Sequence, residues 1–331
     1  MKSKSKTLLD LDTIRLLFEN AGIHNPLNIE PLGAGEFNSI YSATASGKSY
    51  VIKIAPNDPT NSLTYETDMM RQEVYFYSLM SEQAHIRVPK IYFVDFDHKI
   101  IPSNYFIMER LNGSQLDVAQ LTADEQVFVN QKTAEMMAQM HSVRGELFGY
   151  RQNGLKDNWF LAISSMVENL ICDAHRFHHN SSRGKKLLHY IQRNQLMLEC
   201  VESRLVNFDL WSPNQFCIRE NNELHLAWID LERCFFGDRI ADFVSQDFMK
   251  MSLDAKVIGI ETYNHFTDAP LSITNDQRIR FAIMLGYLGL IMEVEKYARY
   301  SLFHLGWWRN VIVCKLLFRN CFEQLAQWSP N

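Results

Sequence analysis

The hydrophobic pattern changes about a third of the way along the chain. Before that point, apolar and polar positions alternate in three short runs separated by turn residues: IEPLG, FNSIYSATA and KSYVIKIAP. Such alternation predicts a β-meander. An amphipathic helix is predicted at 8–23, another helix at 65–83, and further strands near 90–96 and 104–110. Residues 29–110 are therefore expected to form a small sheet that carries one helix.

After Gly113 the pattern becomes mainly helical. Thr122 and Glu125 have the spacing of a capping box and predict a helix start. Further helices are predicted at roughly 157–179, 184–203, 254–267, 276–302 and 307–327. Two short β-like runs, 215–219 and 224–229, bracket a polar turn, so a hairpin is expected within this helical part.

The composition is that of an ordinary globular protein. The chain has 331 residues, of which 47% are hydrophobic and 21% charged, enough apolar material for two lobes. A formal net charge of −5 argues against a basic surface that binds nucleic acid. The longest apolar stretch, 281–292, is too short to span a bilayer, so no membrane partner is expected. Six cysteines without metal-ligand spacing favour a reduced, cytoplasmic protein.

Residues 205–216, LVNFDLWSPNQF, place polar side chains between apolar flanks. Asp209 and Asn214 are five residues apart, and Pro213 excludes a regular helix between them. Aspartate, asparagine, serine and proline are common turn residues, so a simple turn is one interpretation. A further carboxylate, Asp230, follows the predicted hairpin. Phosphoryl transfer requires a carboxylate near the incoming hydroxyl and oxygen ligands for Mg²⁺, and these residues supply both.

Lys53 lies in the run YVIKI, between apolar neighbours. A lysine in such a strand needs a partner, and Glu73 in the following predicted helix is the expected one, with Glu66 and Glu82 as alternatives. The nearby segment SATASGKS, 42–49, differs from a Walker A motif by one glycine. Because a strand and not a helix follows GKS, we interpret it as a hairpin turn.

These motifs resemble, in the same order, those of the aminoglycoside phosphotransferase and choline kinase-like family, small-molecule relatives of the protein kinases. The matching segments are LGAGEFNSIY, VIKI, RQEVYFYSLM, YFIMERLNG, MAQMHSV, NFDLWSPN and WIDLERCFFGDRIADF, which span residues 32 to about 243. The resemblance implies an α+β, bilobal protein-kinase-like fold. It implies a small sheet-plus-helix lobe that binds nucleotide at 1–110, and a larger, mainly helical catalytic and acceptor-binding lobe at 111–331.

The same resemblance implies roles for single residues. Asp209 corresponds to the catalytic-loop aspartate, and Asn214 and Asp230 to the metal ligands. Lys53 is expected to contact the nucleotide phosphates while it pairs with Glu73.

The remaining nucleotide contacts are expected from two backbone segments. One is the phosphate loop Gly33–Ser39, and the other is the hinge between the lobes. The implied contact residues are Gly33, Gly35, Asn38, Ser39, Glu109 and Leu111.

The implied activity is Mg²⁺-dependent transfer of the γ-phosphate of ATP or GTP to a hydroxyl of a small molecule. That acceptor is an antibiotic such as an aminoglycoside or macrolide, or a sugar, fructosamine or amino-alcohol metabolite. One position departs from the family pattern: Asn207 stands where the family usually has histidine, and Phe208 where glycine is common. The alternative, a catalytically silent nucleotide-binding sensor or scaffold of the same fold, has Asn207 as its only support.

Overall fold

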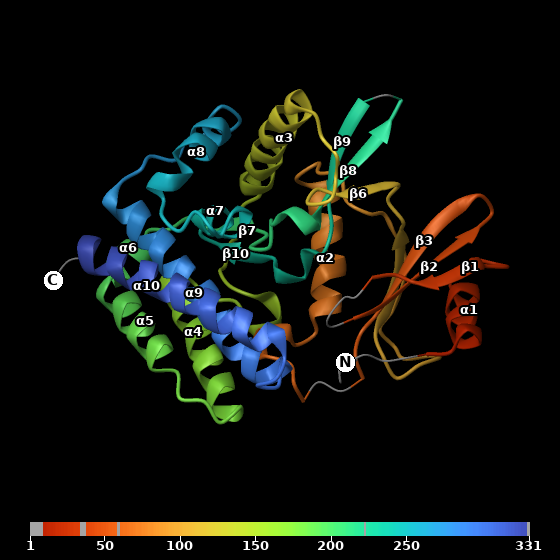
Figure 1. The fold of residues 1–331 in the computed structure, drawn as a ribbon, viewed down its shortest axis with the longest axis horizontal. Coiled ribbons are helices and arrows are strands. Elements are labelled where there is room, and N and C mark those ends of the chain that lie inside the picture. Colours follow the sequence, from red (N-terminus) through yellow and green to blue (C-terminus); the bar gives the residue numbers. More distant parts are fainter. Residues whose placement is uncertain (1–8, 34–37, 58–59, 222, 330–331) are drawn as a thin grey trace.

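The computed structural model describes residues 9–33, 38–57, 60–221 and 223–329 (Figure 1). An antiparallel sheet with two helices occupies one end of the molecule, and helices dominate the rest. The α+β arrangement predicted from the hydrophobic pattern is therefore confirmed. No helix in the described ranges is long and apolar enough to cross a membrane.

The N-terminal sheet has five strands in the order β1-β2-β3-β5-β4, and every neighbouring pair is antiparallel. The strands are β1 Leu27–Pro31, β2 Ser39–Ala45, β3 Lys48–Ile54, β4 Ile91–Asp95 and β5 Tyr105–Glu109. Ser46 and Gly47 connect β2 to β3 with positive φ angles of 50° and 74°, so the GKS segment is the predicted hairpin turn.

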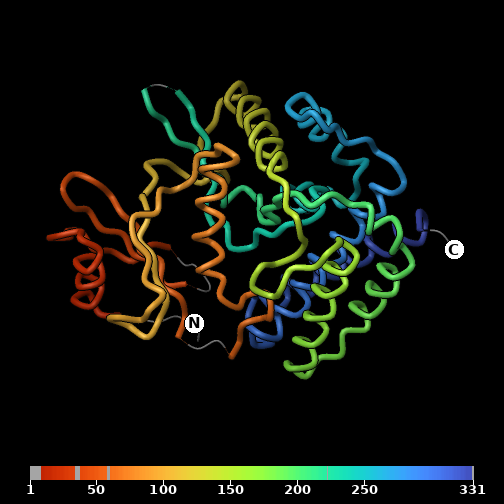
Figure 2. The backbone as a smooth tube through the Cα atoms, turned by 180° about the vertical axis from the view of Figure 1, so that it is seen from behind, coloured from red at the N-terminus to blue at the C-terminus, as the bar shows by residue number. Residues whose placement is uncertain are grey.

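Two helices cover opposite faces of this sheet. Helix α1, Leu11–Asn20, packs Ile14, Leu17 and Phe18 against one face, where Ile52 belongs to the same apolar cluster. Helix α2, Met69–Glu82, lies on the other face. Because neighbouring strand residues point to opposite faces, Lys53 faces α2. Seen from behind, α2 stands between the sheet and the helical part (Figure 2).

The helical part contains eight helices among the described residues. They are α3 Ala123–Ser142, α4 Trp159–Arg176, α5 Ser182–Arg193, α6 Gln195–Glu199, α7 Ile240–Gln246, α8 Val257–Asn264, α9 Asn275–Arg299 and α10 Leu305–Trp328. The predicted capping box of α3 is present: the Thr122 N–H donates to Glu125 Oε2 (2.8 Å) and the Glu125 N–H to Thr122 Oγ1 (3.2 Å). Helices α9 and α10 run side by side at the C-terminal end (Figure 1).

The single helix predicted at 184–203 is wrong. Asn194 ends α5, and its side-chain amide donates to the Tyr190 carbonyl oxygen (2.8 Å) and to Ser329 Oγ (2.6 Å). In a continuing helix the Tyr190 carbonyl oxygen would accept from the backbone N–H of Asn194, but here it accepts from the Asn194 side chain. The short α6 starts from this break. The segment then becomes a strand at Arg204.

Two small sheets lie between these helices. The predicted hairpin is confirmed as β8 Gln215–Glu220 and β9 Glu223–Trp228, and β6, Gly113–Gln115, extends it to three strands. Strands β7, Arg204–Val206, and β10, Phe235–Gly237, form a separate antiparallel pair. The polar loop 207–214 therefore begins directly after one small sheet and ends at the start of the other.

Candidate functional site

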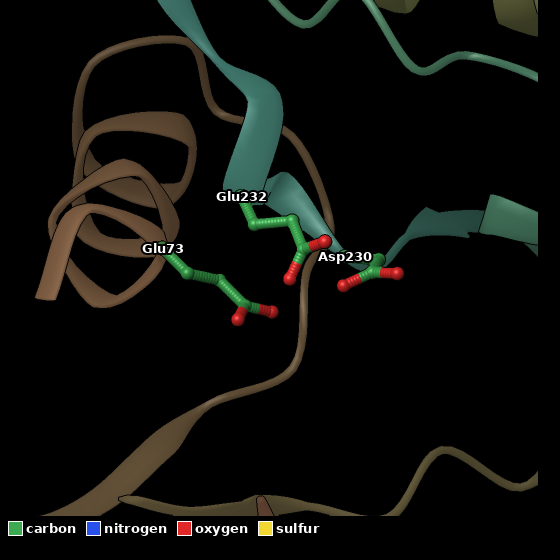
Figure 3. A group of neighbouring side chains, drawn as sticks. All are labelled: Glu73, Asp230 and Glu232. Atoms are coloured by element: carbon green, nitrogen blue, oxygen red, sulfur yellow. The ribbon is translucent and has the colours of Figure 1, made fainter. Parts of the chain in front are cut away.

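Lys53 is the centre of a buried cluster of charges. Its ammonium lies 2.7 Å from Glu73 Oε2, 2.7 Å from Asp230 Oδ1 and 3.3 Å from Glu232 Oε2. The three carboxylates come from α2 and from the turn after β9, and Figure 3 shows them converging on one point. The structure therefore pairs Lys53 with Glu73, while the alternative partner Glu66 forms an ion pair with Arg299.

The cluster contains more negative than positive charge. Although burial opposes its charge, the carboxylates of Asp230, Glu73 and Glu232 raise the pKa of Lys53 well above its usual value. Burial raises the pKa of Glu73 to about 7 and that of Glu232 to about 8. Repulsion from Asp230 acts in the same direction, and the Lys53 ammonium offsets only part of these effects. A second cation would relieve this excess.

The donor set suits a hard divalent cation. One carboxylate oxygen from each of Glu73, Asp230 and Glu232 lies within 4.8 Å of the others. Asn214 is close by, since the N–H of Ile229, the residue before Asp230, donates to its backbone oxygen (3.0 Å). Carboxylate and amide oxygens are the ligands that Mg²⁺ takes in proteins, so Asp230 and Asn214 fit such an ion, and Glu232 adds a donor.

Asp209 lies beside Asn214 and Arg233. The Asn214 amide donates to the Asp209 carboxylate (Oδ2, 3.0 Å) and to its backbone oxygen (3.0 Å), and Arg233 Nε is 4.0 Å from the same Oδ2. Burial raises the pKa of Asp209 to about 6, although Arg233 and Asn214 act in the opposite direction. A carboxylate with a pKa just below neutrality is ionised at pH 7 and suited to accept a proton.

A buried aspartate on α7 binds the backbone of the loop 207–214. Asp242 is wholly buried and accepts hydrogen bonds from the backbone N–H groups of Phe208 (2.7 Å) and Asn207 (3.2 Å). His141 Nε2 lies 2.9 Å from the same carboxylate. The Asn207 side-chain oxygen in turn accepts from the Asp209 N–H (3.2 Å). Hydrogen bonds to Asp242 and to the Asn207 side chain therefore fix the backbone of residues 207–209.

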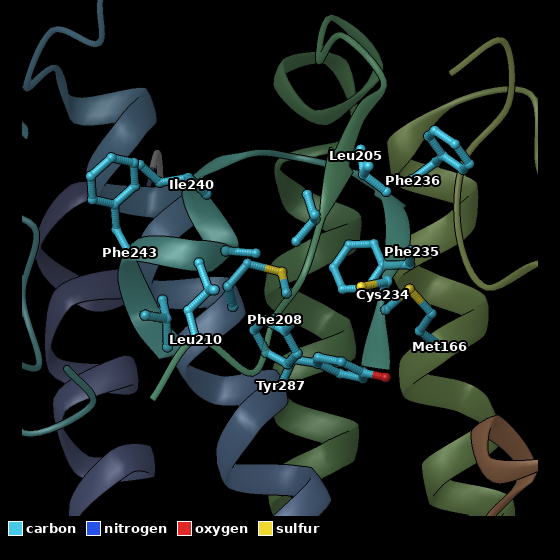
Figure 4. Close-up of a cluster of buried hydrophobic side chains, with 14 of the residues drawn as sticks. Met166, Leu205, Phe208, Leu210, Cys234, Phe235, Phe236, Ile240, Phe243 and Tyr287 are labelled. Atoms are coloured by element: carbon cyan, nitrogen blue, oxygen red, sulfur yellow. The ribbon is translucent and has the colours of Figure 1, made fainter. Parts of the chain in front are cut away.

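The apolar flanks of the loop are its anchor (Figure 4). Leu205 and Leu210 are wholly buried, and the Phe208 ring packs 5.7 Å from those of Phe235 and Tyr287. Phe208 has φ +58°, a left-handed conformation that residues with a side chain rarely adopt. Packing of the ring stabilises this conformation at a position where glycine would adopt it freely.

Asp230 is also held in a left-handed conformation, with φ +60°. Its backbone N–H donates to the Tyr77 hydroxyl on α2 (3.0 Å), and its carboxylate contacts Lys53. Helix α2, strand β3 and the turn after β9 thus fix the same residue.

The residues expected to bind nucleotide have different surroundings. Gly33 has φ +65°, while Gly35 lies outside the described residues. Asn38 and Ser39 are buried where β2 begins. The Glu109 N–H donates to the Lys90 carbonyl oxygen (2.8 Å), whereas the Leu111 backbone has no hydrogen bond to any described residue. The Leu111 N–H is therefore available to a ligand.

Two residues of the site, Glu232 and Arg233, were not predicted from the sequence. Arg233 Nη2 contacts Glu295 Oε1 on α9 (2.9 Å), and the Tyr65 hydroxyl donates to the same oxygen (3.0 Å). The available signal was the DLER segment itself, in which Glu232 is two residues after Asp230.

Comparisons with known proteins agree on one family. The model of the family described as "phosphotransferase enzyme family" (APH) matches residues 28–246. No curated protein sequence matches the chain significantly.

Several solved structures share the fold over nearly the whole chain. A Ralstonia eutropha protein named as a candidate aminoglycoside phosphotransferase has 16% identity and a TM-score of 0.66, and the alignment covers 96% of this chain and 98% of that one. A thermostable mutant of APH(4)-Ia, in a ternary complex with AMP-PNP and hygromycin B, has 17% identity and a TM-score of 0.62, covering 96% and 98%. A Haemophilus somnus protein named as a candidate fructosamine-3-kinase has 18% identity and a TM-score of 0.63, covering 95% and 97%.

Proposed function

Because the chain belongs to the phosphotransferase enzyme (APH) family, we propose that it transfers the γ-phosphate of a purine nucleotide to a hydroxyl of a small molecule in the presence of Mg²⁺. One observation carries the proposal: two linked pairs, Asp209–Asn214 and Lys53–Asp230, meet through the Ile229–Asn214 hydrogen bond. This arrangement brings together a proton acceptor, oxygen ligands and a cation, the parts that phosphoryl transfer needs.

Each side chain has a distinct task in this mechanism. Asp209 orients the acceptor hydroxyl and takes its proton, because its carboxylate is ionised at neutral pH. Asp230 and Asn214 hold Mg²⁺, which when bound neutralises charge on the phosphate oxygens. Lys53 donates to the phosphates, and Glu73 fixes its ammonium in place.

Backbone groups bind the rest of the nucleotide. In this proposal the loop that includes Gly33, Gly35, Asn38 and Ser39 covers the phosphates, and the free Leu111 N–H binds the edge of the purine base. Glu109 contributes its carbonyl group, since its N–H is already bonded to Lys90. The division into a nucleotide-binding lobe, 1–110, and an acceptor-binding lobe, 111–331, belongs to the same proposal.

The alternative function, a catalytically silent nucleotide-binding protein, was supported only by Asn207. The asparagine side chain braces the Asp209 N–H, so the loop retains support without a histidine. Asp209, Asn214, Asp230 and Lys53 are all present with partners. These contacts favour a working enzyme.

The acceptor is expected to be a small hydroxylated molecule. One structural relative binds hygromycin B, an antibiotic, and another is named for a fructosamine substrate. Antibiotics of this kind and fructosamines both carry hydroxyl groups that a kinase can phosphorylate, and both are candidate acceptors here.

Titration of ATP with and without Mg²⁺, in wild type and in Asp230→Ala, tests the proposal. Wild type should bind ATP more tightly with Mg²⁺, and Asp230→Ala should lose most of that gain because a charged ligand is removed. The matched control is Asp97→Ala, whose carboxylate is exposed (77%) in the loop after β4. An unchanged Mg²⁺ effect in Asp230→Ala would contradict the assignment.

A further inference from the structure

A cavity of about 680 Å³ lies against the loop that joins Asp209 to Asn214. Trp211, Ser212 and Pro213 of that loop form one wall. Helix α3 and the segment from α7 to α8 form the others. The cavity therefore lies beside the loop that carries the proposed proton acceptor, with Trp211, two residues after Asp209, as the lining residue nearest to it in sequence. All of the lining residues lie between 116 and 262.

Trp211 gives this cavity an apolar face. Its side chain is exposed (44%), although it is only two residues after Asp209. The loop beneath it is fixed, because the Gln115 side-chain amide donates to the Pro213 carbonyl oxygen (2.8 Å). An exposed indole on a rigid loop offers a flat surface on which an apolar ring face packs.

The charges around the cavity balance. Four lining residues are charged, two of each sign: Asp117, Asp247, Lys250 and Lys256. Lys250 and Asp247 also lie 3.4 Å apart as an ion pair. The most buried of the four is a cation, since Lys256 is 5% exposed and donates from its ammonium to the Asp247 carbonyl oxygen. Burial lowers the pKa of Lys256 to about 8.

Such a lining does not suit a polycation. An aminoglycoside carries several ammonium groups, and each needs a carboxylate when water is removed. Here the carboxylates are matched by lysines, and Lys256 would repel an incoming ammonium. Uncharged polar side chains that can bond to hydroxyl groups line the cavity instead, among them Gln126, Asn130 and Gln246, whereas Thr133 and Gln215 are bonded to each other (2.9 Å).

We propose that this cavity is the acceptor site and that it takes an uncharged sugar or glycoside, with its apolar ring face on Trp211, in preference to a polycationic aminoglycoside. The inference rests on the proposed phosphoryl transfer. The reacting hydroxyl extends from the cavity past Trp211 to Asp209, which takes its proton. The hydroxyl oxygen forms a bond to the γ-phosphorus, and the bond from that phosphorus to the β–γ bridging oxygen breaks. A sugar phosphate and a nucleoside diphosphate leave.

Calorimetry on the full chain tests the class of acceptor directly. Neutral glycosides are compared with amino sugars of the same rings and with kanamycin, each in the presence of AMP-PNP and Mg²⁺. We expect the neutral set to contain ligands that bind at least about tenfold more tightly than their amino counterparts, because like charges oppose binding beside Lys256.

Two variants test the walls of the cavity. Trp211→Ala should weaken glycoside binding about tenfold and leave AMP-PNP binding unchanged. Trp308→Ala removes an exposed tryptophan (56%) from α10, outside the cavity, and should leave both unchanged.

Lys256→Glu should shift the preference about tenfold toward amino sugars, whereas Lys315→Glu, the same charge change at an exposed site on α10, should not. If Lys256→Glu does not fold, Lys250→Glu makes the change at an exposed side chain (59%) of the same wall.

Tighter binding of kanamycin than of every neutral glycoside would overturn the inference. So would binding of neither class, or glycoside affinities that Trp211→Ala leaves unchanged. Failure of the wider proposal has a different signature. AMP-PNP binding without glycoside binding contradicts the cavity assignment, while glycoside binding without AMP-PNP binding contradicts the phosphotransferase mechanism.

Discussion

Asn207 uses one half of its amide and leaves the other half unpaired. Its side chain is wholly buried, and its Oδ1 accepts from the Asp209 N–H at 3.2 Å. Within the described chain its Nδ2 has no hydrogen-bond partner. The oxygen is therefore the part that supports the loop, and the nitrogen carries a desolvation cost.

Removing that oxygen should destabilise the loop. We expect Asn207→Leu to lower the free energy of unfolding by about 1–3 kcal/mol, because the buried Asp209 N–H loses its acceptor. Asn207→His retains an acceptor nitrogen and should keep turnover, although the larger ring has to fit beside Phe208. Denaturant unfolding measures the first effect and acceptor phosphorylation the second.

Asn61→Leu, at an exposed position, is the matched control and should be neutral. A fully inactive wild type together with an active Asn207→His variant would identify the protein as a silent binder.

At the scale of elements, one ammonium joins strand β3, helix α2 and the turn after β9. Lys53 is 5% exposed at its side chain, and Glu73 1%. A buried charge without a partner costs far more than an intact pair contributes. The position of α2 against the sheet therefore depends on the cation more than on any one carboxylate.

Two substitutions in this cluster should differ strongly. Lys53→Met should destabilise the protein by about 3–5 kcal/mol, because it leaves three converging carboxylates without a cation. Glu73→Gln should cost only about 1 kcal/mol, since Asp230, 2.7 Å from the Lys53 ammonium, still neutralises it. Lys48→Met, at an exposed end of the same strand, is the control. Equal losses for Lys53→Met and Glu73→Gln, measured by chemical unfolding, would contradict this account.

Most elements could be predicted from local sequence, and the exceptions have physical causes. Periodicity and the capping box predicted helices such as α3, while the turn residues predicted the β8–β9 hairpin. Strands β7 and β10 have three residues each and pair across about thirty residues of chain, so no local pattern marks them. The break at Asn194 depends on a contact with Ser329, far away in sequence.

The residues of the candidate site can be proposed from the sequence, but the contacts between them cannot. Asp209, Asn214 and Asp230 follow from the order of motifs, whereas the bonds from Asp242 to the loop follow only from the packing of α7. Arg233 reaches Glu295 on α9, beyond the matching segments. Such tertiary contacts have no signal in a single sequence.

At the scale of the whole molecule, Lys256 should make stability depend on pH. Its pKa is lowered from 10.5 to about 8 in the folded chain, so between these values the unfolded chain binds a proton that the folded chain does not. Raising the pH through this window therefore favours folding. Below about pH 8 the full cost of burying the charge is present, and above 10.5 it is gone.

We expect the free energy of unfolding of wild type to rise relative to Lys256→Met by up to about 3 kcal/mol from pH 8 to 10.5. Urea titrations at several pH values measure this difference, and Lys315→Met controls for the loss of a positive charge. Parallel profiles for wild type and Lys256→Met would show that Lys256 is not titrating in this window.

The central claim is that Asp209 takes a proton from an acceptor hydroxyl during phosphoryl transfer from a nucleotide. Mass spectrometry of a panel of hydroxylated acceptors, incubated with ATP and Mg²⁺, tests it most directly in wild type and in Asp209→Asn, with Asp97→Asn as an exposed-carboxylate control. The account predicts a product heavier by one phosphate group in wild type and in the control, and a kcat about 10²- to 10⁴-fold lower in Asp209→Asn with ATP affinity retained. An Asp209→Asn variant that keeps more than about half of the wild-type kcat would contradict the account, because a removed general base costs far more than that.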